Sequence, residues 1–165
     1  MSITFPKPNL LKPKIPGVVA IGLLAAQFLL FGSSSSSESK CDLNIENPHT
    51  STYLKEYKNI EAIKINILSK CNSPQKRTDL IAQIETISNN KQLVAYTFKA
   101  ASALPAQKNL TEATFKNLFV ECSTAKPIMY LAKASGHVYL RNGKTVPVSG
   151  SSPKFVAVPC RISAK

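Results

Sequence analysis

The stretch that decides the fold class is HVYLRNGKTVPV, residues 137–148. Apolar and polar side chains alternate over 137–140 and again over 144–148, and Arg141-Asn142-Gly143 lies between the two runs. Alternation with a period of two is typical of a half-buried strand. Asn-Gly between two such runs is the strongest short hairpin signal that a sequence offers. This stretch therefore predicts a β-hairpin within a strand-rich fold.

The same alternation predicts further strands on both sides of this hairpin. They cover residues 63–68, 80–84, 93–98 and 155–162, and Ser88-Asn89-Asn90-Lys91 supplies a turn between the second and the third. Pro159 has no backbone N–H to donate, so the last strand is expected at the edge of a sheet.

Two segments admit a helix. Residues 78–103 also fit a period of 3.6, but their β-branched and aromatic residues and the Asn89-Asn90 interruption favour strands. A short helix is predicted near 112–118, after a capping residue at Thr111. The prediction is all-β: an immunoglobulin-like β-sandwich of about seven strands with one short helix, preceded by an N-terminal hydrophobic helix. The chain has no Trp to pack on a disulfide, so the prediction covers the architecture and not the topology.

The N-terminal part of the chain predicts export. Residues 1–14 form a basic segment that is expected to stay in the cytoplasm. Residues 15–32 are uncharged and form a transmembrane anchor or a cleaved signal peptide. An anchor needs about 17–25 residues and a signal peptide an apolar core of about 7–15. Large side chains continue up to Gly32, which favours retention as an anchor.

A disulfide-braced domain follows. Residues 33–40 contain five consecutive serines and are predicted to be a flexible linker, and the exported domain covers 41–165. All four cysteines lie in that domain, and an even number in an exported chain indicates disulfides. We favour Cys41–Cys71 with Cys122–Cys160 over the two other pairings, because each pair brackets a locally folded block. A zinc site would need closer spacing than these cysteines have.

The exported part is basic. Of the 21 Lys and Arg, 18 follow the hydrophobic run together with all nine Asp and Glu, which gives a formal charge of +9. These basic residues are mostly Lys and are scattered, a pattern that argues against a nucleic-acid partner. The membrane is predicted as a partner through the N-terminal helix. The scattered lysines favour a soluble basic surface with no partner, and the alternative is weak attraction to anionic envelope polymers.

Catalytic candidates are few. His137, Cys160 and Arg161 are the residue types of a sortase-like site, in which a thiolate acts beside an imidazole, but Cys160 would have to be a free thiol. Ser-x-x-Lys occurs five times, which reflects a composition rich in Ser and Lys, and its partner motifs are absent. His49 is expected to cap or pack in a turn. We predict no catalytic, cofactor or metal site.

The tyrosines are expected to pack in the core rather than to form a stacking platform, because they fall mainly at predicted strand or core positions. They are Tyr53, Tyr57, Tyr96, Tyr130 and Tyr139.

A loose pattern of cysteines and turn residues extends over nearly all of 41–162. It comprises Cys41, Asn47-Pro48-His49-x-Ser51-Thr52, Lys64-x-Asn66, Lys70-Cys71, Cys122 ahead of Tyr130, Ala134-x-Gly136-x-Val138 and Val158-x-Cys160. The pattern resembles small uncharacterised secreted all-β proteins of Gram-positive bacteria. The chain departs from them in its high lysine content and in lacking a Gly-Thr-Tyr after the third cysteine. The resemblance implies export, two disulfides and a β fold, and no activity.

The predicted function is a non-catalytic binding or structural module. It is expected on the outer side of the cell membrane, as a single-pass protein with its N-terminus inside, or secreted. One alternative is a cell-wall hydrolase or transpeptidase, for which Cys160 would need to be free. The other is a basic module that binds anionic polymers.

Overall fold

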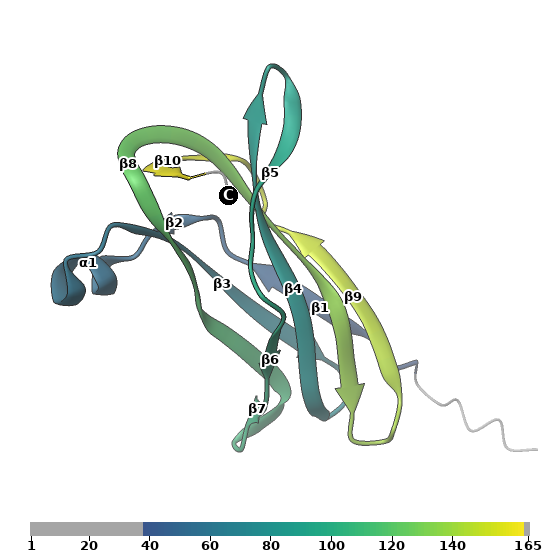
Figure 1. Cartoon of the computed structure of the whole chain (residues 1–165). Coiled ribbons are helices and arrows are strands. Elements are labelled where there is room, and N and C mark those ends of the chain that lie inside the picture. The colour runs from purple at the N-terminus through teal and green to yellow at the C-terminus, as the bar shows by residue number, and fades with distance from the viewer. Residues whose placement is uncertain (1–37, 164–165) are drawn as a thin grey trace, which may run out of the picture. The chain divides into compact units, whose positions relative to one another are not determined.

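The computed structural model describes residues 38–163, which form a curled antiparallel β-sheet and one short helix (Figure 1). The predicted basic segment 1–14, the hydrophobic segment 15–32 and most of the linker 33–40 lie outside the described residues. Between residues 38 and 163, no helix has the length and apolarity needed to cross a membrane.

Ten strands and one helix make up the described part of the chain, so the all-β prediction is confirmed. The strands are β1 (Cys41–Ile45), β2 (His49–Thr50), β3 (Ala62–Cys71), β4 (Gln75–Ser88), β5 (Lys91–Thr97), β6 (Ala101–Ala103), β7 (Pro105–Ala106), β8 (Asn109–Leu140), β9 (Thr145–Ser151) and β10 (Val156–Ile162); the helix is α1 (Thr52–Lys58). About seven strands were predicted. β2, β6 and β7 have only two or three residues each, too few to show an alternating pattern.

The 32-residue strand β8 organises the sheet. Its first half pairs with β3, and its second half pairs with β4 on one side and with β9 and β10 on the other. β1 extends the sheet beyond β3, and β5 extends it beyond β4. Although β3 and β4 are consecutive in the sequence, they bind different halves of one long strand.

The helix predicted near 112–118 is wrong, because these residues lie in β8 and pair with β3. Ala113, Phe115 and Leu118 are the buried positions. A register shift between Ile65 and Ile67 changes the alternation, so that the buried positions 115 and 118 are three residues apart. A β-bulge thus produces a spacing that resembles one helical turn.

Both predicted hairpin turns are confirmed. Ser88 pairs with Lys91 around Asn89 and Asn90, whose φ angles of 50° and 60° are those of a tight two-residue turn. Between β8 and β9 the turn includes Gly143, at a φ of 83°.

The core lies inside the curl of the sheet and receives side chains from both halves of β8 and their partners. Ile65 from β3, Ile84 from β4 and Val138 from β8 are fully buried members of one apolar cluster. Gly136 of β8 pairs with Leu80 of β4, and a Cβ atom at this position would lie 2.0 Å from the carbonyl oxygen of Asp79.

The two predicted disulfides are confirmed. Cys41–Cys71 joins directly opposite residues of β1 and β3, and Cys122–Cys160 joins β8 to β10. β10 pairs only with β8 within residues 38–163, which agrees with the edge position predicted from Pro159.

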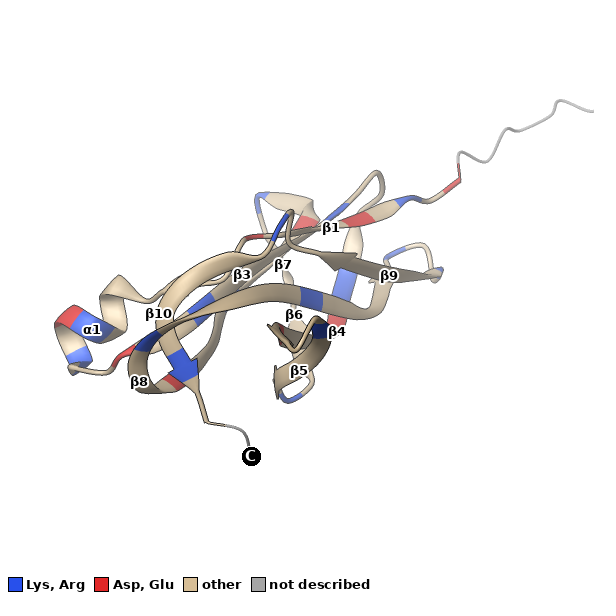
Figure 2. Ribbon diagram, turned by 90° about the horizontal axis from the view of Figure 1, so that it is seen from above, with Lys and Arg blue, Asp and Glu red and all other residues tan. Residues whose placement is uncertain are grey.

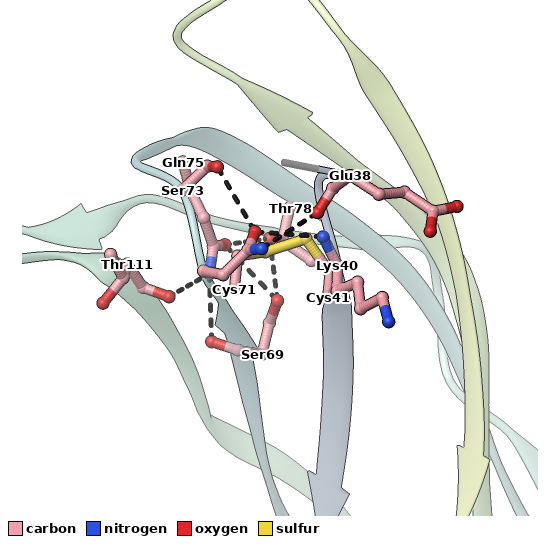
Figure 3. Close-up of a disulfide and its surroundings, with 10 residues drawn as sticks. Glu38, Lys40, Cys41, Ser69, Cys71, Ser73, Gln75, Thr78 and Thr111 are labelled. Atoms are coloured by element: carbon pink, nitrogen blue, oxygen red, sulfur yellow. Dashed lines mark hydrogen bonds between the residues drawn. A yellow bond between two sulfur atoms is a disulfide. The ribbon is translucent and has the colours of Figure 1, made fainter. Parts of the chain in front are cut away.

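A buried polar network lies beside the first disulfide and fixes the turn between β3 and β4 (Figure 3). The side chain of Gln75 donates to the carbonyl oxygens of Ser69 and Thr111, at 3.1 and 2.6 Å, and accepts a hydrogen bond from Thr78 Oγ1 at 2.7 Å. Gln75 therefore ties β3, β4 and β8 together at one end of the sheet. Because both the nitrogen and the oxygen of its side-chain amide have buried hydrogen-bond partners, Gln75 has a structural role.

Candidate functional site

The sortase-like set does not come together. Cys160 is fully buried in its disulfide, and none of the four cysteines is a free thiol. Pro159, next to Cys160, pairs with Pro127, whereas His137 lies further along β8, opposite Asp79. His49 makes a local contact, 3.0 Å from Nδ1 to the carbonyl oxygen of Asn47.

The outward face of β4, β8 and β9 carries an open groove. Alternation along the strands turns the odd-numbered residues of this region outward. The groove has a volume of about 700 Å³ and is lined by side chains from all three strands, among them Asp79, Ile81, Ser135, His137, Pro147 and Ser149. We call it the outer groove.

The outer groove continues along the sheet. A second hollow of about 580 Å³ shares Ile81, Ser135 and Ser149 with the first and extends to Gln83 and Ser151. From residue 147 to residue 151 the groove follows β9 for about 13 Å, at roughly 3.3 Å per residue. This is an open channel suited to an extended ligand rather than an enclosed pocket.

Charged side chains on the outer groove are paired with one another. Asp79 Oδ2 lies 3.0 Å from Arg77 Nη2, and Asp79 Oδ1 accepts a hydrogen bond from Ser102 at 2.6 Å. Lys133 Nζ lies 3.0 Å from a carboxylate oxygen of Glu85. The groove therefore presents compensated charges, hydroxyl groups and small apolar side chains.

Asp79, His137 and Ser135 are the residue types of a hydrolytic triad and lie close together on this face. A triad needs the serine hydrogen-bonded to the imidazole and the imidazole to the carboxylate. Neither hydrogen bond is present, and both oxygens of Asp79 are engaged elsewhere. The described residues also contain no cluster of three or more His, Cys, Asp or Glu that could hold a metal ion. The arrangement can bind through hydrogen bonds and apolar contacts.

Arg77 also stacks over the ring of Tyr139, 4.6 Å from its centroid, at one end of the groove. The basic residues as a whole are spread over the domain, from α1 to the β8–β9 hairpin, with acidic residues between them (Figure 2).

Sequence reasoning identified His137 but missed the rest of the groove. Alternation showed which residues of β8 and β9 face outward, but nothing in the sequence set the register that brings Asp79 of β4 opposite His137. Alternation within one strand shows which of its side chains share a face of the sheet. The neighbours of those side chains on other strands are known only once the strand register is known.

Two tyrosines lie where the prediction did not place them. Tyr53 and Tyr57 are 60% and 71% exposed on α1, with ring centroids 5.1 Å apart, whereas Tyr130 is buried as predicted. The helix begins at Ser51, whose Oγ accepts a hydrogen bond from the Leu54 N–H, and it buries none of its residues. A four-residue spacing on a helix brings the two exposed rings together.

Comparison of the chain with protein-family models, with curated proteins and with solved structures gave no match. Function is therefore inferred from the geometry of this domain alone.

Proposed function

We propose that this domain is a non-catalytic binding module of the cell envelope that holds an extended, uncharged polymer, such as a glycan chain, in the outer groove. The observation that supports this is the open groove along β4, β8 and β9, in which the carboxylate and the basic side chains are paired with one another.

The chemistry of the groove suits a sugar polymer. Ser135, Ser149 and His137 offer neutral hydrogen-bonding groups, and Ile81 and Pro147 offer apolar contact for the C–H face of a sugar ring. Because Asp79 and Lys133 are already neutralised, a charged ligand would have to compete with an existing ion pair.

Export and the sandwich architecture belong to the same proposal. Two closed disulfides support export, since such bonds persist in oxidising compartments. In the sandwich, the half of the sheet around β3 and the half around β4 would be the two layers over the shared core. A membrane anchor or signal peptide over 15–32, and kinship with small secreted all-β proteins of Gram-positive bacteria, complete the proposal.

Two alternatives make different demands on the chain. A transpeptidase or hydrolase using Cys160 would need that thiol free, and the thiol is closed in a disulfide. A module for anionic polymers is favoured by the formal charge of +9 that follows the hydrophobic run. Its binding would fall steeply as salt rises, because screening weakens contacts between exposed charges.

Co-sedimentation with insoluble wall glycan, before and after removal of attached anionic polymers, tests the proposal. We expect binding to both preparations at low and at high salt, and binding at least tenfold weaker in Ile81→Asp. Ile87→Asp is the matched control, because Ile87 lies on the same strand outside the groove and is 47% exposed, against 49% for Ile81.

Three results would count against the outer groove as a glycan site. Equal losses in the two variants would remove the groove from binding. Binding that depends on the anionic polymers and disappears at high salt would favour the polyanion alternative. Release of soluble glycan fragments over time would favour a hydrolase.

A further inference from the structure

The outer edge of β5 has no partner strand within the described residues. β5 is the terminal strand in the order β1-β3-β8-β4-β5 and pairs only with β4. The β4–β5 hairpin projects beyond the rest of the sheet (Figure 1). A terminal strand presents a row of unpaired N–H and C=O groups, which is a template for pairing with another strand.

The projecting hairpin also exposes apolar side chains. Ile87, Leu93 and Val94 are 47%, 49% and 54% exposed. Leu93 and Val94 are adjacent in β5 and therefore point to opposite faces of the hairpin. Native edge strands are usually protected by charges or by proline. β5 contains no proline, and its single charged residue is Lys91.

We propose that β5 pairs antiparallel with β5 of a second copy of this chain, so that the two sheets continue across a two-fold axis. Lys91 is at one end of the strand and Val94 at its centre. Antiparallel pairing keeps the two Lys91 side chains at opposite ends, whereas parallel pairing would place like charges side by side. An acidic partner would gain little from β5, because Lys91 is its only charged residue. A second β5, which is equally poor in charge, is therefore the better match.

The size of the contact sets its strength. Pairing two β5 edges covers only part of Leu93 on one face of the sheet and part of Val94 on the other. It removes at most roughly 200 Å² of apolar surface per copy from water, well below the approximately 800 Å² per partner of a stable interface. Backbone hydrogen bonds along β5 add to this apolar contact. The expected product is a reversible dimer with a Kd on the order of 10 µM or weaker.

Sedimentation velocity of the full chain in a mild detergent, over a range of concentrations, tests the dimer. We expect a concentration-dependent doubling of mass in the wild type and a Kd at least tenfold larger in Val94→Lys, which places two like charges near the two-fold axis. The matched control is Ile81→Lys, since Ile81 is 49% exposed but lies on β4, away from the free edge. A wild type that stays monomeric up to about 1 mM, or equal Kd values in the two variants, would overturn the proposal.

Amide hydrogen exchange separates edge pairing from other modes of association, including contacts through the N-terminal segment. Amides of β5 should become more protected as protein concentration rises, while those of β9 stay unchanged. Dimerisation without added protection in β5 would refute the β5 contact. None of these outcomes depends on glycan binding, so failure of this inference leaves the proposed function untouched.

Discussion

At the scale of single residues, Gly136 faces the backbone of β4 with no room for a side chain. A Cβ atom there would lie 2.0 Å from the carbonyl oxygen of Asp79 and 2.9 Å from the Cα atom of Leu80, and both are backbone atoms that move only if β4 moves. Gly136→Ala should therefore lower the free energy of unfolding by about 2–4 kcal/mol, as measured by urea denaturation.

Gly150→Ala is the control for this substitution. Its Cβ atom would lie 3.5 Å from Ile45 and Leu43, which is an ordinary van der Waals distance. The expected change is within about 0.5 kcal/mol. If Gly136→Ala and Gly150→Ala lower the free energy of unfolding by similar amounts, then a Cβ atom at position 136 does not disturb the pairing of β8 with β4.

Tyr130 predicts a specific loss of stability at alkaline pH. Its ring is buried, and its hydroxyl oxygen accepts a hydrogen bond from the Ile162 N–H at 3.0 Å. Burial raises the pKa of Tyr130 above its ordinary value, although the hydrogen bond from Ile162 and the nearby charge of Arg161 act in the opposite direction. The folded state therefore holds this proton more tightly than the unfolded state, in which tyrosine titrates near pH 10.

The stabilisation from this proton is complete below about pH 10 and is lost as the pH rises through the higher pKa of the folded state. At neutral pH, Tyr130→Phe should cost about 1 kcal/mol through the lost hydrogen bond. In urea unfolding at pH 8, 10 and 11, the gap between wild type and Tyr130→Phe should narrow above pH 10. Tyr57→Phe, at an exposed site, should match the wild type throughout. A constant gap for Tyr130→Phe would contradict the assignment.

At the scale of elements, each disulfide anchors an outer strand. Cys41–Cys71 holds β1 on β3, and Cys122–Cys160 holds β10 on β8, across sequence separations of 30 and 38 residues. In the chain-entropy model, loops of this length correspond to about 3.5–4 kcal/mol each.

Replacing both cysteines of either pair with alanine should lower the free energy of unfolding by about that amount. The Cys122/Cys160 variant should lose more, because Cys160 is fully buried and Ala leaves a cavity there. Urea unfolding without reductant measures both losses. If both variants lose less than about 1 kcal/mol of the free energy of unfolding, the disulfides contribute little to keeping β1 and β10 paired with the sheet.

Elements with local signals could be predicted from the sequence. Asn89-Asn90 and Asn142-Gly143 give turns because their residues accept positive φ, and this preference needs no tertiary contact. α1 was not predicted, although Ser51 is a common N-cap residue, because seven residues are too few to show a helical periodicity in the sequence. The helix predicted over 112–118 from a cap at Thr111 is wrong, because these residues pair with β3 and Thr111 donates its N–H and Oγ1–H to Asn109 Oδ1 instead of capping a helix.

At the scale of the whole molecule, the length of β8 decides where the surfaces lie. One strand that pairs with β3 in its first half and with β4 in its second allows the sheet to curl around a single core. The curl leaves the odd-numbered residues of β4, β8 and β9 facing outward as the outer groove, and it leaves β5 as a free edge. The proposed glycan site in the outer groove and the proposed dimer through β5 both follow from this arrangement of strands.

The sequence by itself determined the strand-rich class, the two hairpin turns and the edge position of the last strand, because alternation, turn residues and the missing N–H of Pro159 act over short distances. It favoured the disulfide pairing that the structure has without excluding the other two. Tertiary structure alone decided that Asp79 lies opposite His137, that 112–118 is extended, that position 136 has no room for a Cβ atom and that Tyr53 and Tyr57 face solvent. Strand register and burial depend on contacts between residues far apart in the chain. Local preferences and periodicity in one sequence do not specify those contacts.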